Sequence, residues 1–179
     1  IVKHCHEQGI SVHYLTTSKV KIESQDNYKG FYWEPNKNII DSHCFEGVDA
    51  IINLAGANIA KRWTVNYKKT ILESRLQALQ CLKVALSKIE THHIKHIVSA
   101  SAIGFYPDSL TKYYDEACLK PSPTFLGEVV SAWESAVDEF SELGLLVSKV
   151  RIGLVLDANE GALPQMVTPI KFGMGAAFG

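Results

Sequence analysis

The fold is decided by the stretch Val48-Asp49-Ala50-Ile51-Ile52-Asn53-Leu54, which runs into Ala55-Gly56. A short apolar run that ends in small residues is typical of a parallel strand buried on both faces. Downstream, leucines recur at helical spacing from about residue 64 to residue 90, which predicts a long amphipathic helix. Beyond it we predict a strand over 97–101, a helix over 125–143 and a strand over 145–156 that is broken at Gly153.

The residues before this stretch add the end of a helix and two further strands. Residues 1–8 have a helical pattern closed by Gly9, and the alternation over 10–16 predicts a strand. The polar segment 19–29 is expected to be a loop, and 30–33 a short strand stopped by Pro35. Because strands alternate with helices, the sequence predicts an α/β fold with a parallel sheet and right-handed crossovers.

Length and composition exclude several classes of protein. The chain has 179 residues, which suits one domain, and a formal net charge of -1 without a basic stripe. We therefore expect a small-molecule partner, and neither nucleic acid nor a membrane. No window is apolar enough for a membrane span and no signal peptide opens the chain, although it does not begin with Met.

The cysteines and histidines give no sign of a metal site. The four cysteines lie far apart, which indicates free thiols and a cytoplasmic location. The histidine clusters at 4–6 and 92–96 lack a thiolate or carboxylate that would complete a tetrahedral set, so we expect no metal.

An ordered set of short motifs carries a resemblance to a known family. The motifs are Asn53-Leu54-Ala55-Gly56, Arg62-Trp63, Ser74-Arg75, Ser99-Ala100-Ser101-Ala102, Trp133-Glu134 and Arg151-Ile152-Gly153-Leu154-Val155-Leu156. Together they closely resemble the epimerase family protein group of the NAD-dependent epimerase/dehydratase branch, which belongs to the extended short-chain dehydrogenases/reductases. The resemblance runs over nearly the whole chain.

The resemblance implies a Rossmann-type, doubly wound parallel sheet with helices on both faces. Residues 1–160 would form the NAD(P)-binding domain, and 161–179 the start of a C-terminal substrate-binding part. In that family the first strand and the Gly-rich dinucleotide loop precede the helix in which this chain starts. Because that strand lies in the middle of the sheet, we expect a sheet in two halves with unpaired edges.

The end of the second strand bears on the choice of cofactor. An NAD-binding Rossmann protein places an acid there, against the ribose 2′-hydroxyl, but no acid occurs from the strand end at Thr16 until Glu23. The hydroxyls and the cation of Thr16, Thr17 and Lys19 suit a 2′-phosphate instead, so we expect NADP rather than NAD. The alternative is a solvated turn with surface lysines.

The resemblance also implies cofactor contacts elsewhere in the chain. The small-residue turn Leu54, Ala55 and Gly56 would lie beside the adenosine ribose and the phosphates, where a bulky side chain blocks close approach. Further contacts would come from Ser99, Thr70, Arg75 and Val155. The alternatives are small residues that serve strand-to-helix packing, and a surface Arg75 paired with Glu73.

For catalysis, the resemblance assigns Ser101 to the hydroxyl that hydrogen-bonds the substrate oxygen. The family also has a Tyr as general acid and a Lys four residues later, which lowers the pKa of the Tyr and holds the nicotinamide ribose. These two positions fall on Phe125 and Val129, and neither side chain can transfer a proton. Tyr106 could stand in as the acid or be a packed aromatic residue. The pair Arg62 and Trp63 would line a substrate pocket or pack on the surface.

Two hypotheses follow from these assignments. The first is an NADP-dependent oxidoreductase or epimerase that acts on a small, sugar-like molecule with an atypical catalytic set. The second is a non-catalytic protein that binds or senses NADP(H). The sequence leaves the substrate and the oligomeric state open.

Overall fold

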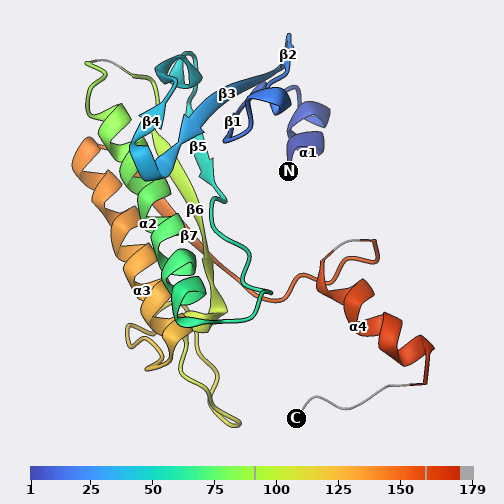
Figure 1. The fold of residues 1–179 in the computed structure, drawn as a ribbon. Helices are drawn as coiled ribbons and strands as arrows, with labels where there is room; N and C mark the ends of the chain where they lie inside the picture. Colours follow the sequence, from blue (N-terminus) through green and yellow to red (C-terminus); the bar gives the residue numbers. More distant parts are fainter. Residues whose placement is uncertain (91, 160, 174–179) are drawn as a thin grey trace.

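The computed structural model describes residues 1–90, 92–159 and 161–173, and its fold is the predicted α/β fold (Figure 1). The strands are β1 (Val12–Thr16), β2 (Ser24–Gln25), β3 (Tyr28–Glu34), β4 (Ile39–Ile40), β5 (Ala50–Asn53), β6 (His96–Ala102) and β7 (Leu146–Ile152). The α-helices are α1 (Val2–Glu7), α2 (Val65–Leu86), α3 (Phe125–Asp138) and α4 (Ala162–Lys171).

The strands form two separate sheets. In the first, β1 pairs in parallel with β3, while β2 and β4 pair with β3 in the antiparallel sense. In the second, β5, β6 and β7 lie in that order and are all parallel. Among the described residues no strand pairs with the other edge of β1 or of β5. This is the divided sheet expected of a Rossmann-type fold whose first strand is not in the chain.

Helices α2 and α3 lie side by side over one face of the β5–β6–β7 sheet (Figure 1). Thr64 caps α2 by accepting a hydrogen bond from the Tyr67 N–H, and Thr124 caps α3 in the same way from the Gly127 N–H. The helix faces that meet the sheet are apolar and supply much of the core: Leu79, Leu82, Leu86, Trp133 and Val137. One core therefore fixes both helices on the sheet.

Both sheets share that core, whereas the opposite face of the second sheet is open. Trp33 and Phe45, from the first half of the chain, belong to the same cluster as Ile97 on β6 and Leu145 just before β7. On the other face, apolar side chains that would be buried in a covered sheet are exposed: Ile52, Leu146 and Val150. The helices thus cover one side of β5–β6–β7 among the described residues.

The boundaries differ from the prediction in a few places. The helix predicted over 125–143 is α-helical only to Asp138 and continues as a 3-10 helix over Glu139–Leu143, which ends at Gly144 in the left-handed region (φ 78°). The segment predicted as a loop, 19–29, holds a 3-10 turn and β2, which pairs with β3. Strand β4 was not predicted. No helix among the described residues could span a membrane.

Candidate functional site

The candidate site lies where the parallel strands β5, β6 and β7 end, at Asn53, Ala102 and Ile152. Carboxyl ends of parallel strands meet at one edge of a sheet, and ligands of doubly wound folds bind in the crevice outside that edge. Of the predicted site residues, the turn Leu54-Ala55-Gly56 follows β5, Tyr106 follows the 3-10 turn after β6, and Val155 follows β7, while Ser99 and Ser101 lie within β6.

A buried pair of polar side chains fixes the turn after β5. Asn53 and Ser99 are directly opposite each other on β5 and β6, and both are almost completely buried. The Asn53 amide Nδ2 donates to Ser99 Oγ at 2.9 Å, and Asn53 Oδ1 accepts from the Ala55 N–H at 3.2 Å. Asn53 therefore ties the small-residue turn to the neighbouring strand, and Ser99 faces Asn53 from inside the core.

Helix α2 holds the same turn from the other side. Ser74 Oγ accepts from the Ala57 N–H at 2.9 Å, and Arg75 Nη1 donates to the Ile71 carbonyl at 2.8 Å and to the Ala57 carbonyl at 3.4 Å. A Cβ atom on Gly56 would lie 3.0 Å from Arg75 Cζ. A side chain at this position would therefore crowd the guanidinium, while the outer face of the turn stays exposed.

Arg75 is therefore a support of this turn. Burial lowers the pKa of Arg75, and its guanidinium lies 5.0 Å from the centre of the Trp133 ring. The carboxylate that could have paired with it, Glu73, lies instead 3.6 Å from Lys69. The structure places Arg75 beneath the proposed cofactor turn, with hydrogen bonds to backbone carbonyls.

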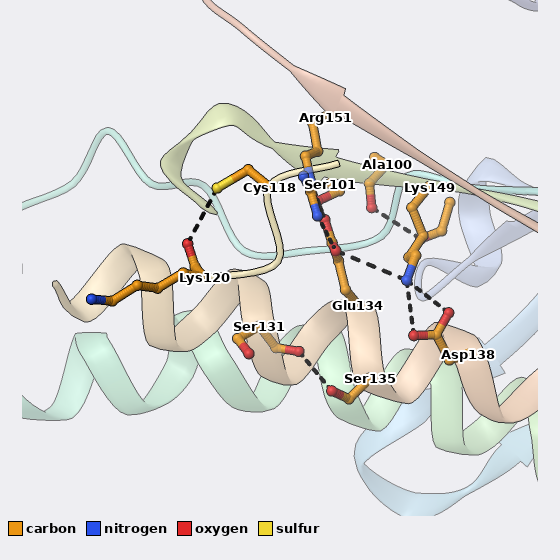
Figure 2. A network of polar contacts seen from close by, with 11 residues as sticks. Ala100, Ser101, Cys118, Lys120, Ser131, Glu134, Ser135, Asp138, Lys149 and Arg151 are labelled. Carbon is orange, nitrogen blue, oxygen red and sulfur yellow. Dashed lines mark hydrogen bonds and ion pairs between the residues drawn. The ribbon is translucent and has the colours of Figure 1, made fainter. Parts of the chain in front are cut away.

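Ser101 belongs to a buried ionic cluster on the α3 side of the sheet (Figure 2). Its Oγ donates to Glu134 Oε1 at 2.5 Å, and Arg151 donates to both oxygens of the same carboxylate, from Nε at 2.8 Å and from Nη2 at 2.9 Å. Ser101 and Arg151 are opposite each other in the β6–β7 register. Lys149, on β7, lies 3.9 Å from Glu134 and 2.7 Å from Asp138.

The electrostatics of this cluster favour the ion pair. Burial raises the pKa of Glu134, but the hydrogen bonds from Arg151 and Ser101 and the positive charges of Arg151 and Lys149 outweigh it and bring the pKa below its usual value. Hydrogen bonding to Glu134 raises the pKa of Arg151. The expected catalytic hydroxyl is thus engaged with a carboxylate that stays charged.

Tyr106 follows the 3-10 turn Ile103–Phe105 at the end of β6. Its ring stacks on Tyr114, with centroids 5.8 Å apart, and the Arg151 guanidinium lies 5.0 Å from its centre. The same guanidinium lies 3.8 Å from the centre of the Phe105 ring. Tyr106 is half-buried at the carboxyl edge, between an aromatic ring and a cation.

Hydrocarbon occupies the two positions that the resemblance assigns to Tyr and Lys. Phe125, the first residue of α3, contacts the Trp63 ring edge-on at 5.6 Å, and the Lys68 ammonium lies 5.0 Å from its centre. Val129 is 3% exposed in the core. Trp63 thus reaches the start of α3, and Arg62, beside it, is exposed.

The remaining predicted contacts are spread out. Thr16, at the end of β1, accepts a hydrogen bond from the Ser18 N–H, and Thr17 and Lys19 are exposed there. The Lys19 ammonium lies 5.0 Å from the centre of the Tyr32 ring. The Thr70 hydroxyl donates a hydrogen bond to the Asn66 carbonyl of its own helix, and Val155 is 66% exposed.

Among the described residues, no His, Cys, Asp and Glu side chains gather into a group of three that could hold a metal.

Sequence reasoning missed the partners that organise this edge. Asn53, Ser74, Glu134 and Arg151 all stood in the motifs, but no role was assigned to them. The signal that could have found them is the strand register. Asn53 and Arg151 are polar residues on the inward face of β5 and β7, where Asn53 is buried and Arg151 is half-buried, and buried polar groups need partners.

Relatives of known sequence carry the name that the resemblance suggested. An epimerase family protein of Staphylococcus saprophyticus is 42% identical over 132 residues, which are 74% of this chain and 44% of that protein. One from Staphylococcus aureus strain N315 is 38% identical over 134 residues, 75% of this chain and 44% of that protein. The chain therefore spans less than half the length of these curated relatives. No family model matches the chain.

Solved structures agree with the fold. The crystal structure of the human epimerase family protein SDR39U1, isoform 2, with NADPH has a TM-score of 0.72 and 25% identity, and the match covers 97% of this chain and 56% of that one. A nucleoside-diphosphate sugar epimerase from Corynebacterium glutamicum has a TM-score of 0.68 and 27% identity, covering 88% of this chain and 31% of that one.

Proposed function

Because the chain belongs to the epimerase family proteins of the extended short-chain dehydrogenase/reductase superfamily, we propose that the full-length protein binds NADP(H) and is an oxidoreductase or epimerase of a small, sugar-like molecule. The NADPH named with its human relative supports this cofactor class. When bound, the cofactor would supply or accept a hydride. The residues of this chain would bind the cofactor, orient the substrate and move the proton.

The observation that carries the proposal is the turn Leu54-Ala55-Gly56 at the carboxyl end of β5. Its outer face is exposed and made of small residues, apart from Leu54. Asn53 and Ser74 hold its backbone by hydrogen bonds at 3.2 and 2.9 Å. The small residues Ala55 and Gly56 leave room for the close approach of a nucleotide, so they fit the adenosine half of the cofactor.

Lys19 supports NADP over NAD. The β1 end carries hydroxyls and this exposed ammonium, where a carboxylate would favour the ribose 2′-hydroxyl of NAD. The acid on the neighbouring strand, Glu34, is already paired with Lys37 at 2.8 Å. A 2′-phosphate would therefore meet a cation at this strand end.

Titration of NADPH and NADH into the full-length protein tests this assignment. We expect NADPH to bind more tightly than NADH. The substitution Lys19→Glu should lower the affinity for NADPH by about tenfold or more and leave the affinity for NADH nearly unchanged, because a charge-assisted contact of about 1.5–3 kcal/mol is lost. Lys29→Glu, at an exposed lysine on β3, is the control of equal charge change. An equal loss for both cofactors in Lys19→Glu would show that Lys19 does not contact the phosphate.

The substrate would enter beside Tyr106, Arg62 and Trp63. Tyr106 is a half-buried residue at the carboxyl edge and the candidate proton donor, and Trp63 offers an apolar ring at the start of α3.

The free cysteines support a reducing compartment such as the cytoplasm. Burial raises the pKa of the Cys44 thiol to about 12, so this thiol stays protonated and unreactive.

The second candidate function is a non-catalytic NADP(H)-binding or sensing protein. It is favoured by Phe125 and Val129, which put hydrocarbon where the family has its proton-transfer pair, and by the engagement of Ser101 with Glu134. A panel of carbonyl compounds offered to the NADPH-loaded protein separates the two candidates. Oxidation of NADPH supports the enzyme, and tight binding without any oxidation supports the sensor.

A further inference from the structure

Arg151 is a cation at the carboxyl edge whose role is not explained by its ion pair alone. Nε and Nη2 bind Glu134, but Nη1 is buried and has no hydrogen-bond partner among the described residues. The Cζ atom of the guanidinium lies 3.8 Å from the centre of the Phe105 ring and 5.0 Å from that of the Tyr106 ring. A buried N–H without a partner costs free energy, which points to an acceptor that appears at another stage of function.

The cluster fixes Arg151 in this place through the carboxylate of Glu134. The carboxylate of Glu134 takes two of its N–H groups in a forked contact, which sets the orientation of the guanidinium plane. Ser101 fixes the carboxylate in turn by a hydrogen bond of 2.5 Å. Only 16% of the Arg151 side chain and 7% of the Glu134 side chain are exposed, so the pair is held within the fold.

A phenol that gives up its proton to a substrate becomes a phenolate, and a nearby cation stabilises that charge. The Lys that would do so in this superfamily is replaced here by Val129, which is 3% exposed and apolar. Tyr106 has the Arg151 guanidinium instead. Hydrogen bonding to Glu134 raises the pKa of Arg151, and the Tyr106 hydroxyl raises it further, while burial acts in the opposite direction. The guanidinium is therefore permanently charged.

We propose that Tyr106 and Arg151 form the proton-donating pair of this site, with Arg151 as the cation that stabilises the Tyr106 phenolate. The inference rests on the proposed function. In a carbonyl reduction the hydride of NADPH would add to the carbonyl carbon while the Tyr106 O–H bond breaks and its proton goes to the carbonyl oxygen. The alcohol and NADP⁺ leave, and the Tyr106 phenolate beside Arg151 takes its proton back from water.

Ser101 and Glu134 are then positioning residues that act through Arg151. Their hydrogen bonds hold the guanidinium against Tyr106, and neither needs to touch the substrate. Lys149, on the same strand as Arg151, lies 3.9 Å from Glu134, but its ammonium points to Asp138 at 2.7 Å (Figure 2). It offers a matched control for the loss of a cation from this cluster.

Nitration by tetranitromethane tests the pair without cofactor, because this reagent attacks phenolates. In the full-length protein at mildly alkaline pH, the rate at Tyr106 is measured by peptide mass against that at Tyr113, which is fully exposed. We expect Arg151→Met to slow nitration of Tyr106 by about tenfold or more, Arg151→Lys to keep most of the rate, and Lys149→Met to leave it unchanged. An unchanged rate in Arg151→Met overturns the pair, as does equal slowing in Lys149→Met.

If Arg151→Met alone fails to fold, the double variant with Glu134→Leu removes both charges and answers the same question. Turnover is the second measurement. In the NADPH-dependent reduction, Tyr106→Phe should lower kcat by about a hundredfold or more with KM and NADPH affinity unchanged, whereas Tyr113→Phe should have no effect. Full kcat in Tyr106→Phe, or NADPH binding without turnover, overturns the proton-donor role. Failure of NADPH binding would refute the proposed function, and the nitration result would still decide the pair.

Discussion

Removal of Glu134 should cost the protein much of its stability. Removal of its partner Arg151 in the same variant should restore most of the stability that is lost. Glu134→Ala leaves Arg151 without its two charge-assisted hydrogen bonds, in a place where 16% of its side chain is exposed. Breaking a buried pair from one side costs about 3–5 kcal/mol. A domain is stable by only about 5–15 kcal/mol, so the single variant should be near its folding threshold.

The double variant Glu134→Leu/Arg151→Met removes both charges and fills the space with hydrocarbon. Its loss should be far smaller than that of Glu134→Ala, because no uncompensated charge is left in the interior. Urea unfolding of the full-length protein, followed by tryptophan fluorescence, measures both losses. Glu128→Ala is the control on the same helix, where an exposed first-turn carboxylate should be worth below about 1 kcal/mol.

The same pair predicts a dependence on pH. The pKa of Glu134 in the folded protein is lower than its ordinary value of 4.5. Its contribution to stability is therefore complete above the ordinary value, and it is lost as the pH falls through the lower folded-state pKa. The double variant should lack this acid-side loss. The reasoning is refuted if Glu134→Ala costs no more than Glu128→Ala, or if the double variant Glu134→Leu/Arg151→Met loses as much stability as Glu134→Ala.

Two further substitutions test the contacts that position the backbone around the site. Gly127→Ala usually favours a helix, but here the new Cβ would lie 2.0 Å from the Ser122 carbonyl oxygen, so we expect a loss above about 1 kcal/mol; a gain in thermal unfolding temperature would contradict the packing described. Asn53→Ala should cost about 1–3 kcal/mol and weaken NADPH binding, because Ser99 and the Ala55 N–H lose their buried partner. Asn58→Ala, which removes a similar turn contact at an exposed position, should do neither in the same assays.

Much of the fold could be predicted because its signals are local. The apolar run that ends at Asn53 and the leucine spacing of α2 each lie within one element, and both predictions agree with the structure. The change to a 3-10 helix after Asp138 was missed, because the apolar spacing continues through Phe140, which is buried in the core.

The site was only partly predictable, since its contacts join distant residues. Glu134 lies 33 positions from Ser101 and 17 from Arg151, and no periodicity links them. A serine at a strand end has the same sequence signature whether it faces a substrate or a buried carboxylate. The family pattern therefore assigned a catalytic hydroxyl, and the register of β6 and β7 was needed to find its neighbours.

The division of the sheet has a consequence for how the protein folds. The outer edges of β1 and β5 carry rows of backbone groups that no strand pairs with among the described residues, and such edges readily recruit strands from other molecules. A strand that paired with both edges would have to find two partners, β1 and β5, which β2, β3 and β4 separate in the sequence. Synthesis of this segment by itself would expose both edges at once and favour self-association over refolding.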